Sequence, residues 1–156
     1  MSSDSELIRA MARYIISSSA ESSYYKRQIK QILESTASMP QFTGDPMVDA
    51  DRILLDLGAP TKLAGYQYCV KAIAIVAEDG YARRKMMDLY NAVAEEYHVS
   101  SVVVSRTIAN LVDAVFDKTT IEVLVKYFGN SIDYNSGKVM PGEFIRRLAS
   151  YIRGHK

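Results

Sequence analysis

Hydrophobic residues recur along most of the chain at intervals of three and four, the spacing of one face of an α-helix. From residue 46 onwards this pattern predicts six helices, at 47–57, 61–79, 82–97, 101–116, 120–128 and 142–153. Gly58-Ala59-Pro60 ends the first of them, since glycine stops a helix and proline cannot continue it. Thr61 is expected to cap the next. No long stretch alternates apolar and polar residues as a strand does, so we predict an all-α chain.

Two further segments differ from these helices. Residues 1–45 show two short helical patterns followed by a linker with Pro40 and Gly44, and we interpret them as a two-helix N-terminal extension that serves dimerisation. Residues 46–156 then form the main domain. Within it, the connection from Gly129 to Pro141 carries Asn135-Ser136-Gly137, which predicts either a simple turn or a short hairpin.

The stretch from Val93 to Ile108 meets the requirements of a helix-turn-helix. Ala94 supplies the small residue needed where two helices cross. His98-Val99 provides the tight turn, and Ser100 or Ser101 caps the second helix. That helix carries an apolar stripe facing the first, formed by Val104, Ile108, Leu111 or Val112, and Val115. A plain helical hairpin with a similar turn is the alternative interpretation.

The second helix of such a motif enters the major groove of DNA, where its first turns reach base edges. Arg106 suits the two-pronged contact to guanine, Asn110 the contact to adenine, and Val102 the methyl group of thymine. The residues predicted to bind bases are Ser101, Val102, Ser105, Arg106 and Asn110. Those predicted to bind phosphate are Lys62, Arg83, Arg84, Lys85, Ser100 and Lys118.

The formal net charge of the chain is only +1. Neutralisation of phosphates supplies much of the affinity of nucleic-acid-binding proteins, and many of them carry a clear basic excess. Any contact with double-stranded DNA must therefore use local charge, and a homodimer would double that charge. The same near-neutral balance leaves room for a protein partner.

Other chemistry is sparse in the sequence. Cys69 is the one cysteine and lies in an apolar helical stretch, so we interpret it as a buried thiol. With two histidines and no cysteine pair we expect no metal and no cofactor. No catalytic triad, apolar carboxylate pair or phosphate-binding loop is present, which argues against an enzyme. The N-terminus lacks the features of a signal peptide and the longest apolar run, near Ile73–Ala77, is too short to cross a membrane, so a cytoplasmic location is predicted.

From about Met47 to Lys156 the chain is similar to the C-terminal effector domain of the sporulation-initiation response regulators. The resemblance is carried by several uncommon pairs in one order. They are Leu57-Gly58-x-Pro60, Gly65-Tyr66-x-Tyr68, Ala72-Ile73, Val76, Asp79, Leu89-Tyr90, Ala94, Tyr97, Arg106, Ile108, Phe128-Gly129, Glu143-Phe144-Ile145 and His155-Lys156. The resemblance implies a six-helix effector fold whose third and fourth helices form a DNA-binding helix-turn-helix.

Two features depart from the family pattern. Regulators of this family carry a phosphoacceptor receiver domain ahead of the effector domain, and Met1–Asp45 is too short for one. The family's recognition helix is rich in charged residues, whereas family positions for base contacts fall here on Val103, Ser105 and Ala109. The operator sequence is therefore not inherited from the family.

Two functions follow from these observations. The first is a sequence-specific transcription regulator that reads the major groove. The alternative is a relative that has lost DNA recognition and uses the same fold to bind a protein, as an antagonist or adaptor from a mobile element. The apolar run Val102-Val103-Val104 favours the alternative, because exposed valines suit a protein partner.

Overall fold

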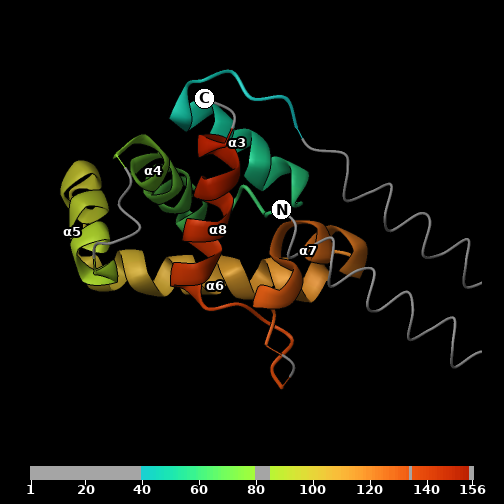
Figure 1. The fold of residues 1–156 in the computed structure, drawn as a ribbon. Coiled ribbons are helices and arrows are strands. Elements are labelled where there is room, and N and C mark those ends of the chain that lie inside the picture. The colour runs from blue at the N-terminus through green and yellow to red at the C-terminus, as the bar shows by residue number, and fades with distance from the viewer. Residues whose placement is uncertain (1–39, 80–84, 134, 155–156) are drawn as a thin grey trace, which may run out of the picture. The chain divides into compact units, whose positions relative to one another are not determined.

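The computed structural model describes residues 40–79, 85–133 and 135–154 (Figure 1). Six α-helices account for most of them, and the described ranges contain no strand, which confirms the all-α prediction. The helices are α3 (Pro46–Asp56), α4 (Ala64–Asp79), α5 (Met86–Tyr97), α6 (Ser101–Lys118), α7 (Ile121–Phe128) and α8 (Pro141–Arg153). The predicted N-terminal helices at residues 1–39 lie outside the described residues.

The described residues fall into two compact units. One is built from Pro40–Thr119 and Lys138–Lys156, and the other contains the described part of Thr120–Gly137. The first unit holds five of the helices, with α4 and α8 lying between α3 and α6 (Figure 1). The second unit contains α7 and the 3-10 turn η2 (Gly129–Ser131).

Local signals in the sequence fix the start of α3. Pro46 occupies its first position, and the side chain of Asp45 caps it by accepting a hydrogen bond from the Met47 N–H at 3.0 Å. Asp49 is fully buried, and its carboxylate accepts three hydrogen bonds from the segment just before the helix. The donors are the Thr43 N–H (2.7 Å), the Thr43 hydroxyl (2.9 Å) and the Gly44 N–H (3.0 Å). These three hydrogen bonds replace the ones that the Asp49 carboxylate would otherwise make with water.

The boundary between α3 and α4 confirms one prediction and corrects another. Gly58 ends α3 in the left-handed conformation (φ 76°), as predicted. Thr61, however, does not cap α4. A separate turn closes first, with the Leu63 N–H donating to the Pro60 carbonyl at 3.3 Å. The helical hydrogen bonds therefore begin at Leu63, whose carbonyl accepts from the Tyr66 N–H, and α4 starts at Ala64.

Helix α4 is the centre of the first unit and packs against α3, α5, α6 and α8. Its buried residues cover an arc of about 200°, wider than the stripe of a surface helix, because α4 packs against four neighbours. They are Gly65, Tyr66, Cys69, Val70, Ala72, Ile73, Ala74, Val76 and Ala77. Cys69 is fully buried, which confirms its interpretation as a core residue. Small residues in this set let the neighbouring helices approach closely.

Helix α8 completes the core of the first unit. Its predicted stripe is confirmed, since Phe144, Ile145, Leu148, Ala149 and Ile152 are all buried. The connection that precedes it contains a turn closed by the Gly137 N–H and the Asp133 carbonyl at 2.8 Å. The described residues of this connection form no strand, so the turn is present without the hairpin.

Candidate nucleic-acid interface

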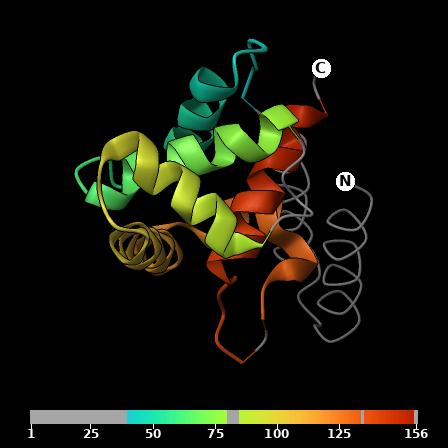
Figure 2. The same ribbon diagram turned by 90° about the vertical axis from the view of Figure 1, so that its left-hand side faces the viewer.

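Helices α5 and α6 have the geometry of a helix-turn-helix. Three residues, 98–100, separate them, and their axes are bent by 105° (Figure 2). Ala94 is buried on α5, as the crossing of two helices requires. The predicted apolar stripe of α6 is likewise buried, at Val104, Ile108, Leu111, Val112 and Val115. Tyr97 of α5 also meets Tyr68 of α4 edge to face, with ring centroids 5.3 Å apart.

The turn between the two helices is a Schellman motif. His98 adopts the left-handed conformation (φ 56°, ψ 44°) and ends α5. The Val99 N–H donates to the Ala94 carbonyl at 3.0 Å, and the His98 N–H donates to the Glu95 carbonyl at 3.4 Å. Among the described residues, His98 is the one non-glycine residue with positive φ. These bonds set the direction in which the chain enters α6.

Ser100 caps α6. Its backbone is extended, and its side-chain oxygen accepts a hydrogen bond from the Val103 N–H at 3.2 Å. The sequence left Ser100 and Ser101 as equal candidates, and the structure selects Ser100. The capping oxygen keeps its hydroxyl proton for a further acceptor. The positive end of the helix dipole lies at the same place, which favours an anion there.

Helix α6 rests on α4 through a close contact between backbones. A Cβ atom added to Gly65 of α4 would clash with the Thr107 carbonyl, and it would lie 3.0 Å from the Ile108 nitrogen. The side chain of Thr107 is also held, because its hydroxyl donates to the Val103 carbonyl at 2.7 Å. The middle of α6 is thereby fixed relative to the core.

The opposite face of α6 is open to solvent. Val102 (68% exposed), Arg106 and Asn110 succeed one another at four-residue intervals and form an exposed row. At 3.6 residues per turn these three positions lie within an arc of about 80°. Ser101 and Ser105, the other residues predicted to bind bases, are half-buried and lie about 100° and 60° round the helix from Val102, on the side of the buried stripe. The structure therefore brings Val102, Arg106 and Asn110 onto one exposed side of α6, and it does not bring Ser101 and Ser105 into that row.

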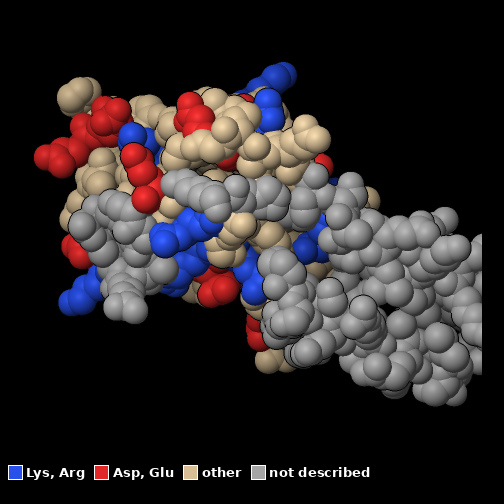
Figure 3. Space-filling view, turned by 45° about the horizontal axis from the view of Figure 1, so that its top comes forward, with Lys and Arg blue, Asp and Glu red and all other residues tan. Residues whose placement is uncertain are grey.

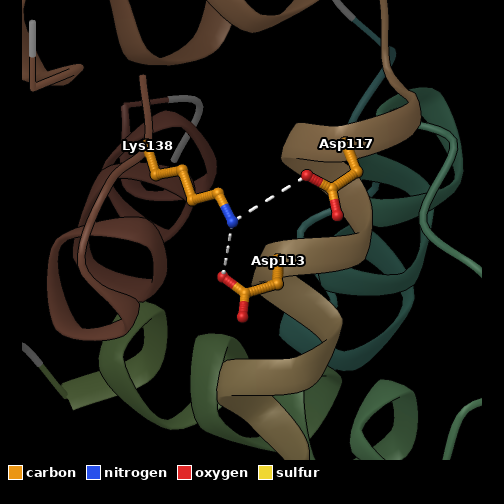
Figure 4. A network of polar contacts seen from close by, with 3 residues as sticks. All are labelled: Asp113, Asp117 and Lys138. Carbon is orange, nitrogen blue, oxygen red and sulfur yellow. Dashed lines mark hydrogen bonds and ion pairs between the residues drawn. The ribbon is translucent and has the colours of Figure 1, made fainter. Parts of the chain in front are cut away.

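The exposed row continues into acidic residues that the sequence interpretation did not include. Asp113 and Asp117 lie on the same side of α6 and are 59% and 66% exposed. The ammonium group of Lys138 lies 3.3 Å from an oxygen of Asp113 and 3.8 Å from an oxygen of Asp117 (Figure 4). The spacing of the two aspartates was readable from the helical pattern. Lys138 was not, because it comes from a distant connection.

The residues predicted to bind phosphate are spread over the unit. Ser100 and Lys118 are both exposed but stand at opposite ends of α6, about 27 Å apart along its axis. Lys62 is exposed just before α4, and Lys85 is exposed just before α5. Arg83 and Arg84 lie outside the described residues. The described positions thus come from separate places along the chain: one before α4, one before α5 and one at each end of α6.

Charge on the surface is mixed. Basic and acidic side chains are interspersed on the face drawn in Figure 3. Near the turn, Glu95 and Glu96 are exposed at the end of α5. Among the described residues, no three His, Cys, Asp or Glu side chains gather as a metal site would require. In the same ranges no single helix combines the length and hydropathy needed to span a membrane; α5 and α6 reach them only when taken together as a bent pair.

Comparison with protein families agrees with this architecture. The family model described as "Sporulation initiation factor Spo0A C terminal" matches residues 50–152, the greater part of the chain. The match includes all of α4, α5, α6 and α7, and it confirms the resemblance seen in the sequence. The chain therefore belongs to the family of Spo0A C-terminal domains, which are DNA-binding domains of transcription regulators and not enzymes.

Proposed function

We propose that this protein is a sequence-specific transcription regulator that places the first half of α6 in the major groove of DNA. The observation that carries the proposal is the exposed row of Val102, Arg106 and Asn110 on a helix whose opposite face is buried. The guanidinium of Arg106 matches the N7 and O6 acceptors of guanine, and the Asn110 amide matches adenine. Val102 contacts a thymine methyl, while Ser101 and Ser105 contact bases at the margin.

Phosphate contacts hold the motif in register. The Ser100 hydroxyl and the first N–H groups of α6 meet one phosphate, since the helix N-terminus favours an anion. Lys62, Lys85 and Lys118 meet others around the motif, together with Arg83 and Arg84. With so few cations, one copy binds weakly. A homodimer, formed through residues 1–45 ahead of the domain 46–156, supplies a second half-site and more affinity.

Selection from a random DNA library at low salt tests this proposal. We expect one enriched motif, with binding that weakens as salt rises because counterions are released. Arg106→Ala should lose about 10- to 100-fold in affinity for the selected site and accept any base at one position. Arg52→Ala is the matched control, since Arg52 is exposed on α3 and has no place in the motif. Absence of binding by the unmodified protein at low salt would refute the proposal.

Exposure of Val102 favours a second candidate function, the binding of a protein partner. A β-branched apolar side chain that is 68% exposed suits a hydrophobic contact better than a base edge. A stoichiometric partner bound by the unmodified protein and lost in Val102→Asp, with no enriched DNA motif, would support this candidate. An enriched motif whose binding depends on Arg106 would exclude it as the main function.

A further inference from the structure

The exposed row of α6 changes its chemistry halfway along. Its first half carries Val102, Arg106 and Asn110, and its second half carries Asp113 and Asp117. All five positions lie within the same arc of about 80°. The row thus carries groups suited to DNA in its first half and two carboxylates in its second half, while Lys118 lies outside this arc at the same end of α6.

The length of this row exceeds what the groove can hold. From Val102 to Asp117 the helix rises about 22 Å, whereas the major groove is about 12 Å wide. If the first half of α6 lies in the groove, the second half passes close to a phosphate backbone. Two exposed carboxylates there repel the DNA, and at a spacing of four residues they also repel each other.

Lys138 is placed to cancel this repulsion. Its ammonium group lies within 4 Å of both carboxylates, as Figure 4 shows. The lysine is 25 residues from Asp113 in sequence and stands just before α8. Its neighbour Val139 is buried in the core, which fixes the backbone at this point. The fold therefore fixes the backbone position from which the Lys138 side chain extends toward the two carboxylates.

We propose that Lys138 determines the DNA affinity of α6 indirectly, by neutralising Asp113 and Asp117 where the helix leaves the groove. This inference rests on the proposed function, because it requires that α6 approach DNA. Lys138 is a positioning residue in this role; it touches the two carboxylates and makes no contact with phosphate. Its ion pairs are exposed, so their contribution to folding is small and their effect is seen in binding.

A double-mutant cycle on the full chain tests the inference with the selected DNA site as probe. Lys138→Gln should lose about 3- to 10-fold in affinity at low salt, and the loss should shrink as salt rises. Asp113→Asn combined with Asp117→Asn should bind more tightly than the unmodified protein. Lys138→Gln added to that double variant should then change affinity by less than about 2-fold, because the two carboxylates through which the lysine acts have been removed.

Lys71→Gln is the control: Lys71 lies on α4, outside the helix-turn-helix, and within the described part of the chain it forms no ion pair with either aspartate, so its loss should leave affinity within about 2-fold. The melting temperature of each variant should stay within about 3 °C of the unmodified protein. Equal loss from Lys138→Gln with and without the aspartates would overturn the inference and show a direct phosphate contact. Unchanged affinity in Lys138→Gln would overturn it too. Both results can be obtained only if the unmodified protein binds DNA. If it does not bind DNA, the proposed function fails, and this outcome differs from a failure of the role of Lys138.

Discussion

Gly65 of α4 lies directly against the carbonyl of Thr107 in α6, so that two helix backbones meet without an intervening side chain. The contact sits halfway along the helix that carries the candidate base-binding residues. Rigid placement of such residues is needed for sequence reading, since small displacements break two-pronged contacts. Gly65 therefore sets the position of α6 although it is itself buried.

We predict that Gly65→Ala destabilises the protein by about 2–3 kcal/mol, because the added methyl group clashes with backbone that cannot rotate away. Denaturant unfolding followed by circular dichroism measures this change. Gly154→Ala serves as control: its Cβ meets nothing closer than the Ser150 carbonyl at 3.4 Å, and its stability should stay within about 0.5 kcal/mol. Equal stability of the two variants would contradict the close approach.

A second prediction concerns the left-handed residue His98. For residues other than glycine the left-handed conformation is less stable by about 1–2 kcal/mol. A glycine avoids this strain, but it offsets part of the gain because it makes the unfolded chain more flexible. His98→Gly should therefore stabilise the protein by about 0.5–1 kcal/mol. His98→Val should destabilise it by more than about 1 kcal/mol, because β-branched side chains tolerate this region least. Thermal unfolding of the three proteins would rank them, and a loss of stability in the glycine variant would count against the turn geometry.

The third prediction separates two roles of Ser100. Ser100→Ala should cost about 1 kcal/mol of stability, because the cap of α6 is lost. Ser100→Asp should keep the stability of the unmodified protein, since aspartate caps as well as serine and its charge favours the helix dipole. The same aspartate should lower DNA affinity about 10-fold or more by repelling phosphate. Parallel unfolding and DNA titrations check this, and full DNA affinity in Ser100→Asp would remove Ser100 from the phosphate contacts.

A fourth prediction follows from the buried thiol of Cys69. Burial raises the pKa of this thiol well above its usual value, so the native protein keeps a proton that the unfolded chain releases. The contribution of the protonated Cys69 thiol to the free energy of unfolding is fully present below pH about 8.5, and it falls as the pH rises above that value. Burial and the hydrogen bond to Asp51 likewise raise the pKa of Tyr66, which extends the decline above pH about 10.

Urea unfolding at pH 7, 9 and 10 measures this dependence. Between pH 8.5 and 10 the slope should approach about 1.4 kcal/mol per pH unit for one thiol. Cys69→Ala should be less stable at pH 7, because it leaves a small cavity, yet it should lose less stability between pH 7 and 10. Constant stability of the unmodified protein over this range would show that the thiol ionises freely in the native state.

The sequence was sufficient where local chemistry decides the structure. Gly58 and Ser100 end and begin helices by interactions with their own neighbours, so their roles were readable in advance. Thr61 was misjudged because a turn closed by the Leu63 N–H and the Pro60 carbonyl forms in place of the cap. The residue types alone do not show whether the Thr61 side chain caps the helix or the turn from Pro60 to Leu63 forms.

The sequence was insufficient where partners are far apart along the chain. The exposed row on α6 was predictable, since helical spacing places Arg106 and Asn110 together once the buried stripe is known. The neutralisation of Asp113 by Lys138 was not, because it depends on where a long connection returns to the helix. The need for glycine at position 65 was hidden for the same reason: it reflects the distance between two helices.

The carboxylate of Asp49 has a mechanical consequence. It fastens Thr43 and Gly44 to the first turn of α3, and Arg52 donates to the Gln41 carbonyl at 2.8 Å beside it. Load applied to the chain at residue 40 would therefore reach these bonds first, ahead of the helices of the core. The carboxylate of Asp49 thus anchors the point at which the chain enters the first unit.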